Sequence, residues 1–198
     1  MRKVILFVSI FTAALLLASG CAAPAAAQPE SDVVTVSLSF EKQKGYASNQ
    51  FAVWIEDTNG TLIKTLYVTS FTAEGGFEKR PDAIPVWVER AGASTKSETD
   101  AASGATPKSG TLRYVWDMTD ESGARVPAGK YVFVVEGTLR WKNQVLFSGE
   151  IECGGSTSSA EAAATYTYLA SDDSPALNAD SAENAMIGSV SAAYIPPK

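Results

Sequence analysis

The segment "FAVWIEDTNGTLIKTLYVTSF", residues 51–71, decides the fold class. Two runs rich in β-branched and aromatic residues flank a polar stretch at residues 57–60, which is typical of a β-hairpin. Asn59 and Gly60 form a pair that favours a two-residue turn in which both residues have positive φ. The segment therefore predicts two antiparallel strands joined by a tight turn.

Strand patterns continue on both sides of this hairpin. Residues 34–40, "VTVSLSF", alternate apolar and polar side chains, as a half-buried strand does. Residues 112–137 are expected to pair two more strands across a polar connection, and residues 138–151 a further two that turn near Lys142 and Asn143.

The C-terminal part keeps a rough alternation in residues 164–169 and 189–195, which predicts two late strands joined by a mobile acidic loop at residues 171–184. No stretch has a long 3.6-residue period, so we expect no major helix and at most a helical turn around residues 94–102. About seven or eight short strands with frequent turns predict an all-β protein, a single Ig-like antiparallel β-sandwich over residues 33–195.

Aromatic residues are concentrated in these strands. Because their neighbours are apolar, we interpret them as core residues: Trp54, Trp116, Trp141, Phe51, Tyr131 and Phe133. An exposed aromatic face that binds sugars is the alternative.

The N-terminus, "MRKVILFVSIFTAALLLASGC", has Arg2 and Lys3 before a short apolar run. A run shorter than the roughly 20 residues of a membrane span is typical of a secretory signal. Its end resembles a bacterial lipoprotein signal, with Ala18 where an aliphatic residue is usual. The resemblance implies a signal peptide at residues 1–20 and a diacylglycerol on the Cys21 thiol. A plain signal peptide cleaved near Ala27 is the alternative.

Residues 21–32 have the composition of a flexible tether, so we expect an extracytoplasmic domain anchored to the membrane by lipid. Removal of residues 1–20 changes the formal charge from −6 to −8, because Arg2 and Lys3 are lost. An acidic chain of this kind argues against a nucleic-acid partner, whose phosphates require clustered Lys and Arg.

The chain contains no histidine, which excludes Ser-His-Asp triads, Cys-His pairs and histidine metal sites within it. Beyond Cys21 the sole cysteine is Cys153, and two cysteines are too few for a thiolate zinc site. With Cys21 lipidated, Cys153 has no partner for an intrachain disulfide. Cys153 is expected to be an inert small residue in a strand. We therefore expect no metal site and no enzymatic activity of the chain alone.

Residues 116–137, "WDMTDESGARVPAGKYVFVVEG", resemble the Ig-like module of the flagellar hook-capping protein, with its Trp-Asp-x-x-Asp, glycine turn and Val-Pro-x-Gly-x-Tyr. The resemblance implies that Asp117 and Asp120 order the turn through side-chain-to-backbone hydrogen bonds, and that Gly129 permits the reversal into the strand of Tyr131. It supports the fold and carries no flagellar role.

A broader resemblance covers residues 33–195 and rests on residues 49–88, 100–112 and 137–151. These blocks resemble a family of uncharacterised bacterial periplasmic proteins, often mislabelled as hook-capping. Its members tend to be encoded beside membrane proteins with PepSY domains and beside flavin transferases. This association implies an extracytoplasmic redox context with a PepSY-type membrane protein as partner.

The stretch "DAASGATPKSG", residues 100–110, is similar to the acceptor pattern of secreted FAD-dependent flavin transferases, Asp-x-x-[Ser/Thr]-Gly-Ala-Thr. The resemblance implies that FMN is esterified through its phosphate to Thr106, and that the transferase recognises four more residues: Asp100, Ser103, Gly104 and Ala105. Small neighbours suit a transferase that must close around a hydroxyl. Lys108 stands where known acceptors have Ser or Thr, and its charge could pair with the phosphate.

The sequence thus predicts a lipid-anchored accessory of electron transfer with FMN on Thr106. One alternative is a module without cofactor that docks on a membrane redox or envelope partner through a sheet edge or residues 77–92. In that segment Lys79, Arg80 and Arg90 with Trp87 either contact an anionic or flavin-bearing partner or belong to a solvated loop. A carbohydrate-binding lipoprotein is the other alternative.

Overall fold

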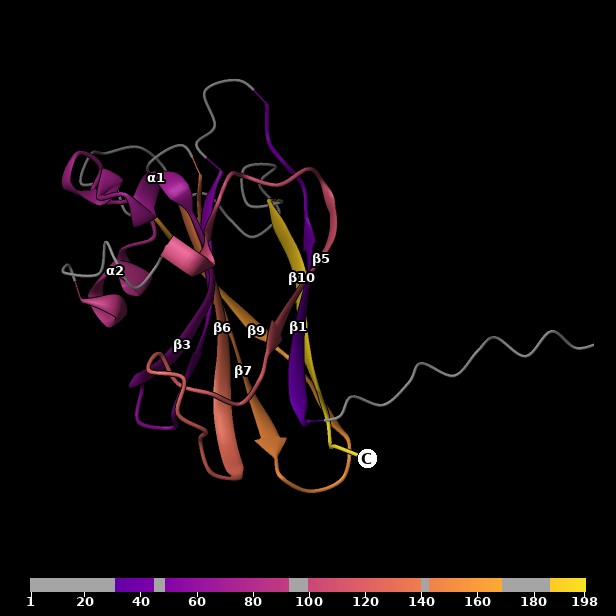
Figure 1. The fold of residues 1–198 in the computed structure, drawn as a ribbon. Helices are drawn as coiled ribbons and strands as arrows, with labels where there is room; N and C mark the ends of the chain where they lie inside the picture. Colours follow the sequence, from indigo (N-terminus) through magenta and orange to yellow (C-terminus); the bar gives the residue numbers. More distant parts are fainter. Residues whose placement is uncertain (1–30, 45–48, 93–99, 140–142, 169–185) are drawn as a thin grey trace, which may run out of the picture.

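The computed structural model describes residues 31–44, 49–92, 100–139, 143–168 and 186–198. They form two packed β-sheets that Figure 1 shows edge-on. One sheet has four antiparallel strands, in the spatial order β5 (Gly110–Trp116), β1 (Val33–Phe40), β10 (Ile187–Ile195) and β8 (Ser158–Glu161).

The other sheet has six strands, in the order β4 (Ser103–Gly104), β3 (Leu62–Thr69), β2 (Gln50–Glu56), β6 (Gly129–Leu139), β7 (Asn143–Cys153) and β9 (Ala163–Tyr168). Every pair in it is antiparallel except β3 with β4, which is parallel. The predicted all-β sandwich is confirmed.

The predicted hairpin of residues 51–71 is β2 and β3, but its turn is wider than expected. Gly60 has φ 84°, whereas Asn59 does not have positive φ. The Gly60 N–H donates to the Asp57 carbonyl (3.1 Å), and the Asp57 carboxylate accepts from the N–H groups of Asn59 and Thr61. This is a type I turn followed by a left-handed glycine. The prediction of a two-residue turn was wrong because the Asp57 side chain organises one additional residue.

The strands β5 and β6 do not pair, contrary to the prediction for residues 112–137. β5 pairs with β1 and β6 with β2 and β7, so the connection at residues 117–128 carries the chain from one sheet to the other. The expected hydrogen bonds of this connection are present. Asp117 accepts from Thr119, and Asp120 accepts from the N–H groups of Ser122 and Ala124.

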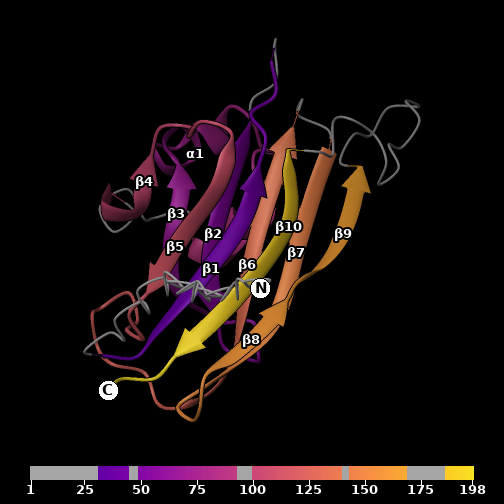
Figure 2. The same cartoon turned by 90° about the vertical axis from the view of Figure 1, so that its right-hand side faces the viewer.

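The two late strands exist as β9 and β10, but in different sheets. β9 pairs with β7, while β10 lies between β1 and β8. β8 was not expected, and Figure 2 shows it running on into β9 as the chain moves from one sheet to the other. The predicted signal peptide with Cys21, most of the tether, Trp141 and the loop at residues 171–184 lie outside the described residues.

Aromatic side chains fill the core, as predicted. Trp116, Phe51 and Phe133 are fully buried between the sheets, and Tyr131 is 6% exposed. Trp54 is also fully buried, but on the outer face of the six-stranded sheet. These five therefore cannot form an exposed sugar-binding face.

Helical segments cover that outer face: α1 (Ser70–Ala73), the 3-10 turn η1 (Gly76–Glu78) and α2 (Pro85–Ala91). Residues 77–92 were expected to be a solvated loop, which was wrong for α2. Pro85 occupies the first turn, and the Glu136 carboxylate of β6 accepts from the N–H groups of Val86 (3.2 Å) and Trp87 (2.8 Å). A carboxylate from strand β6 thus satisfies the first N–H groups of α2, a helix too short to be stable alone.

Candidate functional site

The segment that resembles a flavin acceptor begins at the edge of the six-stranded sheet and ends in the other sheet. The 3-10 turn η2 (Asp100–Ala102) contacts β3, and Ser103 and Gly104 then pair with Val68 and Thr69. Residues 105–109 cross to β5 (Figure 1). A helical turn was expected around residues 94–102; η2 covers residues 100–102, and residues 94–99 lie outside the described residues.

The Tyr67 hydroxyl holds the middle of this segment. It donates toward the carbonyl oxygens of Gly104 (3.2 Å) and Ala105 (3.0 Å). Burial raises the Tyr67 pKa to about 12, so the hydroxyl keeps its proton at neutral pH. A Cβ at Gly104 would lie 2.9 Å from Tyr67 Cε2, so the close approach of the ring requires glycine there.

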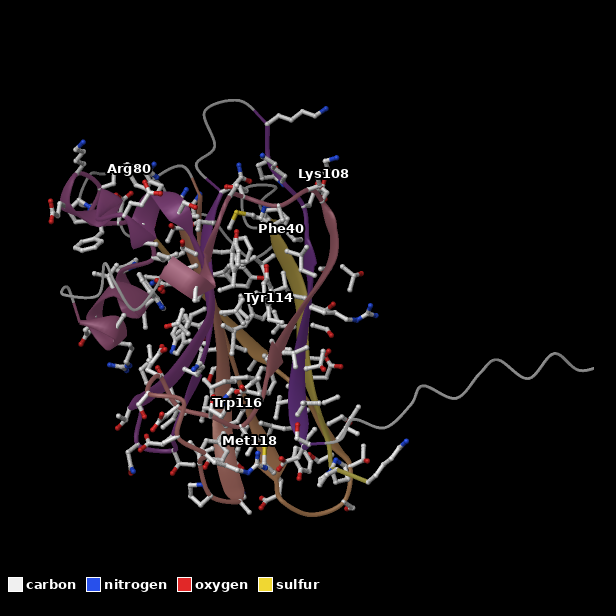
Figure 3. All side chains as sticks on the ribbon, viewed as in Figure 1. Phe40, Arg80, Lys108, Tyr114, Trp116 and Met118 are labelled. Atoms are coloured by element: carbon white, nitrogen blue, oxygen red, sulfur yellow. The ribbon has the colours of Figure 1, made fainter. Side chains whose placement is uncertain are left out.

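Four aromatic rings pack together beside the segment. The centroids of Phe40 and Phe51 are 5.1 Å apart, those of Phe51 and Tyr67 4.8 Å, and those of Tyr67 and Tyr114 5.0 Å. Figure 3 shows Phe40 and Tyr114 between the two sheets. Burial, and secondarily the charge of Tyr67, raises the pKa of Tyr114. The segment therefore rests on a packed aromatic support rather than on solvent.

Thr106 follows the part of the segment that Tyr67 holds. Its side chain is half-buried, and no other described residue hydrogen-bonds to it. Ala105 and Lys108 are exposed, and Lys108 points away from the sandwich in Figure 3. Ser103 and Gly104 are half-buried, and Asp100 lies in η2. Residues 103–106 of the acceptor pattern thus form one continuous stretch that is half-buried to exposed.

A groove of about 350 Å³ opens beside η2, between β5 and the part of β3 that does not pair with β4. We call it the β3–β5 groove and define it by six of its lining residues: Lys64, Leu66, Ala101, Ala102, Trp116 and Glu121. Lys64 Nζ donates to the Asp120 carbonyl (2.6 Å), and Glu121 Oε1 accepts from the Thr65 N–H (2.7 Å). Its position could not be predicted, because β3 and β5 belong to different sheets and face each other only when the sheets pack.

The basic side chains in the segment of residues 77–92 do not come together in one site. Arg90 pairs with Glu56 (3.1 Å), and the Arg80 guanidinium lies 5.0 Å from the Phe71 ring centroid. Lys79 is exposed. Trp87 is 2% exposed and donates to Thr65 Oγ1 (3.3 Å), so its ring belongs to the packing of α2 on the sheet.

Cys153 is 2% exposed at the end of β7, and burial, with a smaller contribution from Glu152, raises its pKa to about 11. A buried thiol of this kind is unreactive. Within the described ranges, no three His, Cys, Asp or Glu residues are grouped so that they could hold a metal ion. The described helices include none that is long and apolar enough to cross a membrane.

The sequence pattern of one family, described as "Predicted periplasmic protein (DUF2271)", matches residues 32–170. The chain belongs to the DUF2271 family. The match runs from the residue before β1 to just after β9, whereas β10, which follows it, is an inner strand of the four-stranded sheet. Neither a curated protein nor a solved structure matches this DUF2271 chain. The predicted membership of an uncharacterised periplasmic family is confirmed, and with it an extracytoplasmic location.

Proposed function

We propose that this protein is a lipid-anchored extracytoplasmic accessory of electron transfer that carries FMN on Thr106. The observation that carries the proposal is the placement of the acceptor pattern. Residues 103–106 of the pattern form one half-buried to exposed stretch, with the Thr106 hydroxyl free of any hydrogen bond within the described part of the chain. A side-chain hydroxyl that is not engaged in the fold is available to a modifying enzyme.

The modification would be a phosphoryl transfer from FAD. The Thr106 oxygen attacks the phosphorus on the flavin side of the pyrophosphate, the bond to AMP breaks, and the hydroxyl proton leaves with AMP as the second product. The attached flavin would supply one- or two-electron chemistry that a chain without histidine lacks. A covalent bond would also keep the cofactor from diffusing away outside the cytoplasm.

Membrane attachment through Cys21 and a PepSY-type partner complete the proposal. The signal-like N-terminus supports the anchor, and the periplasmic description of the family supports the compartment. An anchored carrier would remain close to a redox protein in the same membrane.

The test is co-expression of the chain with a flavin transferase, followed by intact mass and fluorescence of the denatured protein. We expect a gain of one FMN less one water, lost in Thr106→Ala and kept in Thr111→Ala, an exposed threonine on β5 outside the pattern. An unmodified mass with an active transferase would refute the proposal.

The second candidate is an interaction module without cofactor. It is favoured by the contacts of Tyr67, which account for Gly104 and for the path of the segment without any flavin. In that case Thr106→Ala would leave binding to a membrane partner unchanged, and the mass would show no flavin.

A further inference from the structure

We infer that the β3–β5 groove receives the isoalloxazine ring of the flavin that Thr106 carries; this inference rests on the proposed function. The ring would insert between β3 and β5, with its carbonyl-bearing end toward Lys64 and Glu121.

Connectivity brings the groove within reach of Thr106. Ala101 and Ala102 belong both to the groove wall and to the acceptor segment, and they occupy its two variable positions. Thr106 lies four positions after Ala102, so their Cα atoms are at most about 14 Å apart. A ribityl phosphate spans roughly 9 Å at ordinary single-bond lengths, and the tricyclic ring extends this reach.

The size of the groove suits the ring. Its volume of about 350 Å³ lies at the lower end of small-molecule sites, which measure about 300–1,000 Å³. It would hold a planar tricyclic ring but not an entire dinucleotide. FMN attached through its phosphate needs to bury only its ring.

The chemistry of the lining also matches. Leu66, Ala101 and Ala102 are apolar surfaces for the ring faces and the methyl-bearing end. Lys64 uses one of its three N–H donors on the Asp120 carbonyl, and Glu121 uses only Oε1 on the Thr65 N–H. Lys64 and Glu121 therefore retain hydrogen-bonding capacity toward the ring carbonyls and the ring N–H, without a further hydrogen-bond partner among the described residues. The third charged lining residue, Asp117, accepts through Oδ1 from the N–H and hydroxyl of Thr119.

These charges predict opposite effects on the redox potential. The reduced ring carries negative charge, which Lys64 stabilises and Glu121 destabilises. Lys64→Gln should lower the midpoint potential of attached FMN, and Glu121→Gln should raise it. Arg113→Gln is the matched control, because Arg113 is an exposed cation of β5 that does not line the groove.

The experiment uses the full chain co-expressed with a transferase, and intact mass first establishes attachment in each variant. We then expect high fluorescence anisotropy of the attached flavin, its loss in Ala102→Arg, and the two opposite shifts in potential, while circular dichroism confirms folding. An unmodified wild-type mass overturns the proposed function together with this inference. Attached flavin that rotates as freely as FMN in solution, or an Arg113→Gln shift as large as that of Lys64→Gln, overturns the groove alone.

Discussion

The buried carboxyl of Glu136 allows a quantitative test of how α2 is attached to the sheet. Glu136 is fully buried on β6 and accepts three hydrogen bonds, from the Val86 N–H, the Trp87 N–H and the Gln144 amide. Burial raises its pKa from 4.5 to about 7, although these hydrogen bonds act in the opposite direction. Ionisation in the folded protein therefore costs about 3 kcal/mol more than in the unfolded chain.

This difference fixes the sign of the pH dependence. Below pH 4.5 the carboxyl is protonated in both states, and its contribution to stability is complete. Between pH 4.5 and about 7 the unfolded chain ionises while the folded protein keeps its proton, so the free energy of unfolding falls by up to about 3 kcal/mol. Above that range the contribution is lost and the curve levels.

The assay is urea unfolding of the wild type and of Glu136→Gln across this range. Glutamine cannot titrate, so subtracting the two curves isolates Glu136 and cancels the other carboxylates. We expect the wild type to lose stability relative to the variant as the pH rises. A flat difference would refute the reasoning, and a relative gain would show that the three hydrogen bonds outweigh burial.

Two further predictions concern the acceptor segment and the free thiol. Tyr67→Phe should cost about 1 kcal/mol of stability and speed amide exchange in residues 103–106, because the donor to Gly104 and Ala105 is lost. Tyr114→Phe is the control, since the Tyr114 hydroxyl has no hydrogen bond within the described part of the chain. Equal amide exchange in both variants would contradict the prediction. Cys153 should react slowly with Ellman's reagent in the folded protein and rapidly in urea. In the folded protein the thiol is buried, and its pKa, raised from 9 to about 11, lowers the thiolate fraction roughly 100-fold. Equal reaction rates in the two states would contradict the prediction and show that β7 opens readily.

The separate elements of the fold were predictable because strand periodicity is a local property. The alternation in residues 34–40 and the hairpin of residues 51–71 appear as β1 and the β2–β3 pair. Asp117 and Asp120 order the following turn as expected, because a short carboxylate bonds to backbone within a few residues of itself.

Long-range pairing was harder to predict. β5 and β6 follow each other in the sequence but lie in different sheets, and β10 joins β1 across nearly the entire chain. α2 was missed because Glu136, a residue of β6, satisfies the first N–H groups of that helix. The sequence does carry weak signals for α2, with Pro85 in its first turn and Gly92 after its end.

By itself, the sequence determined the all-β class, the family membership and the order of the acceptor pattern, because these depend on residue type and short spacing. The tertiary structure alone decided that the pattern rests on Tyr67, that Thr106 follows the held part of the segment, and that Ala101 and Ala102 line a groove with Lys64 and Glu121. The physical reason is that β3 and β5 are separated in the chain but become facing edges when the two sheets pack, and the space between such edges is defined only once both sheets exist.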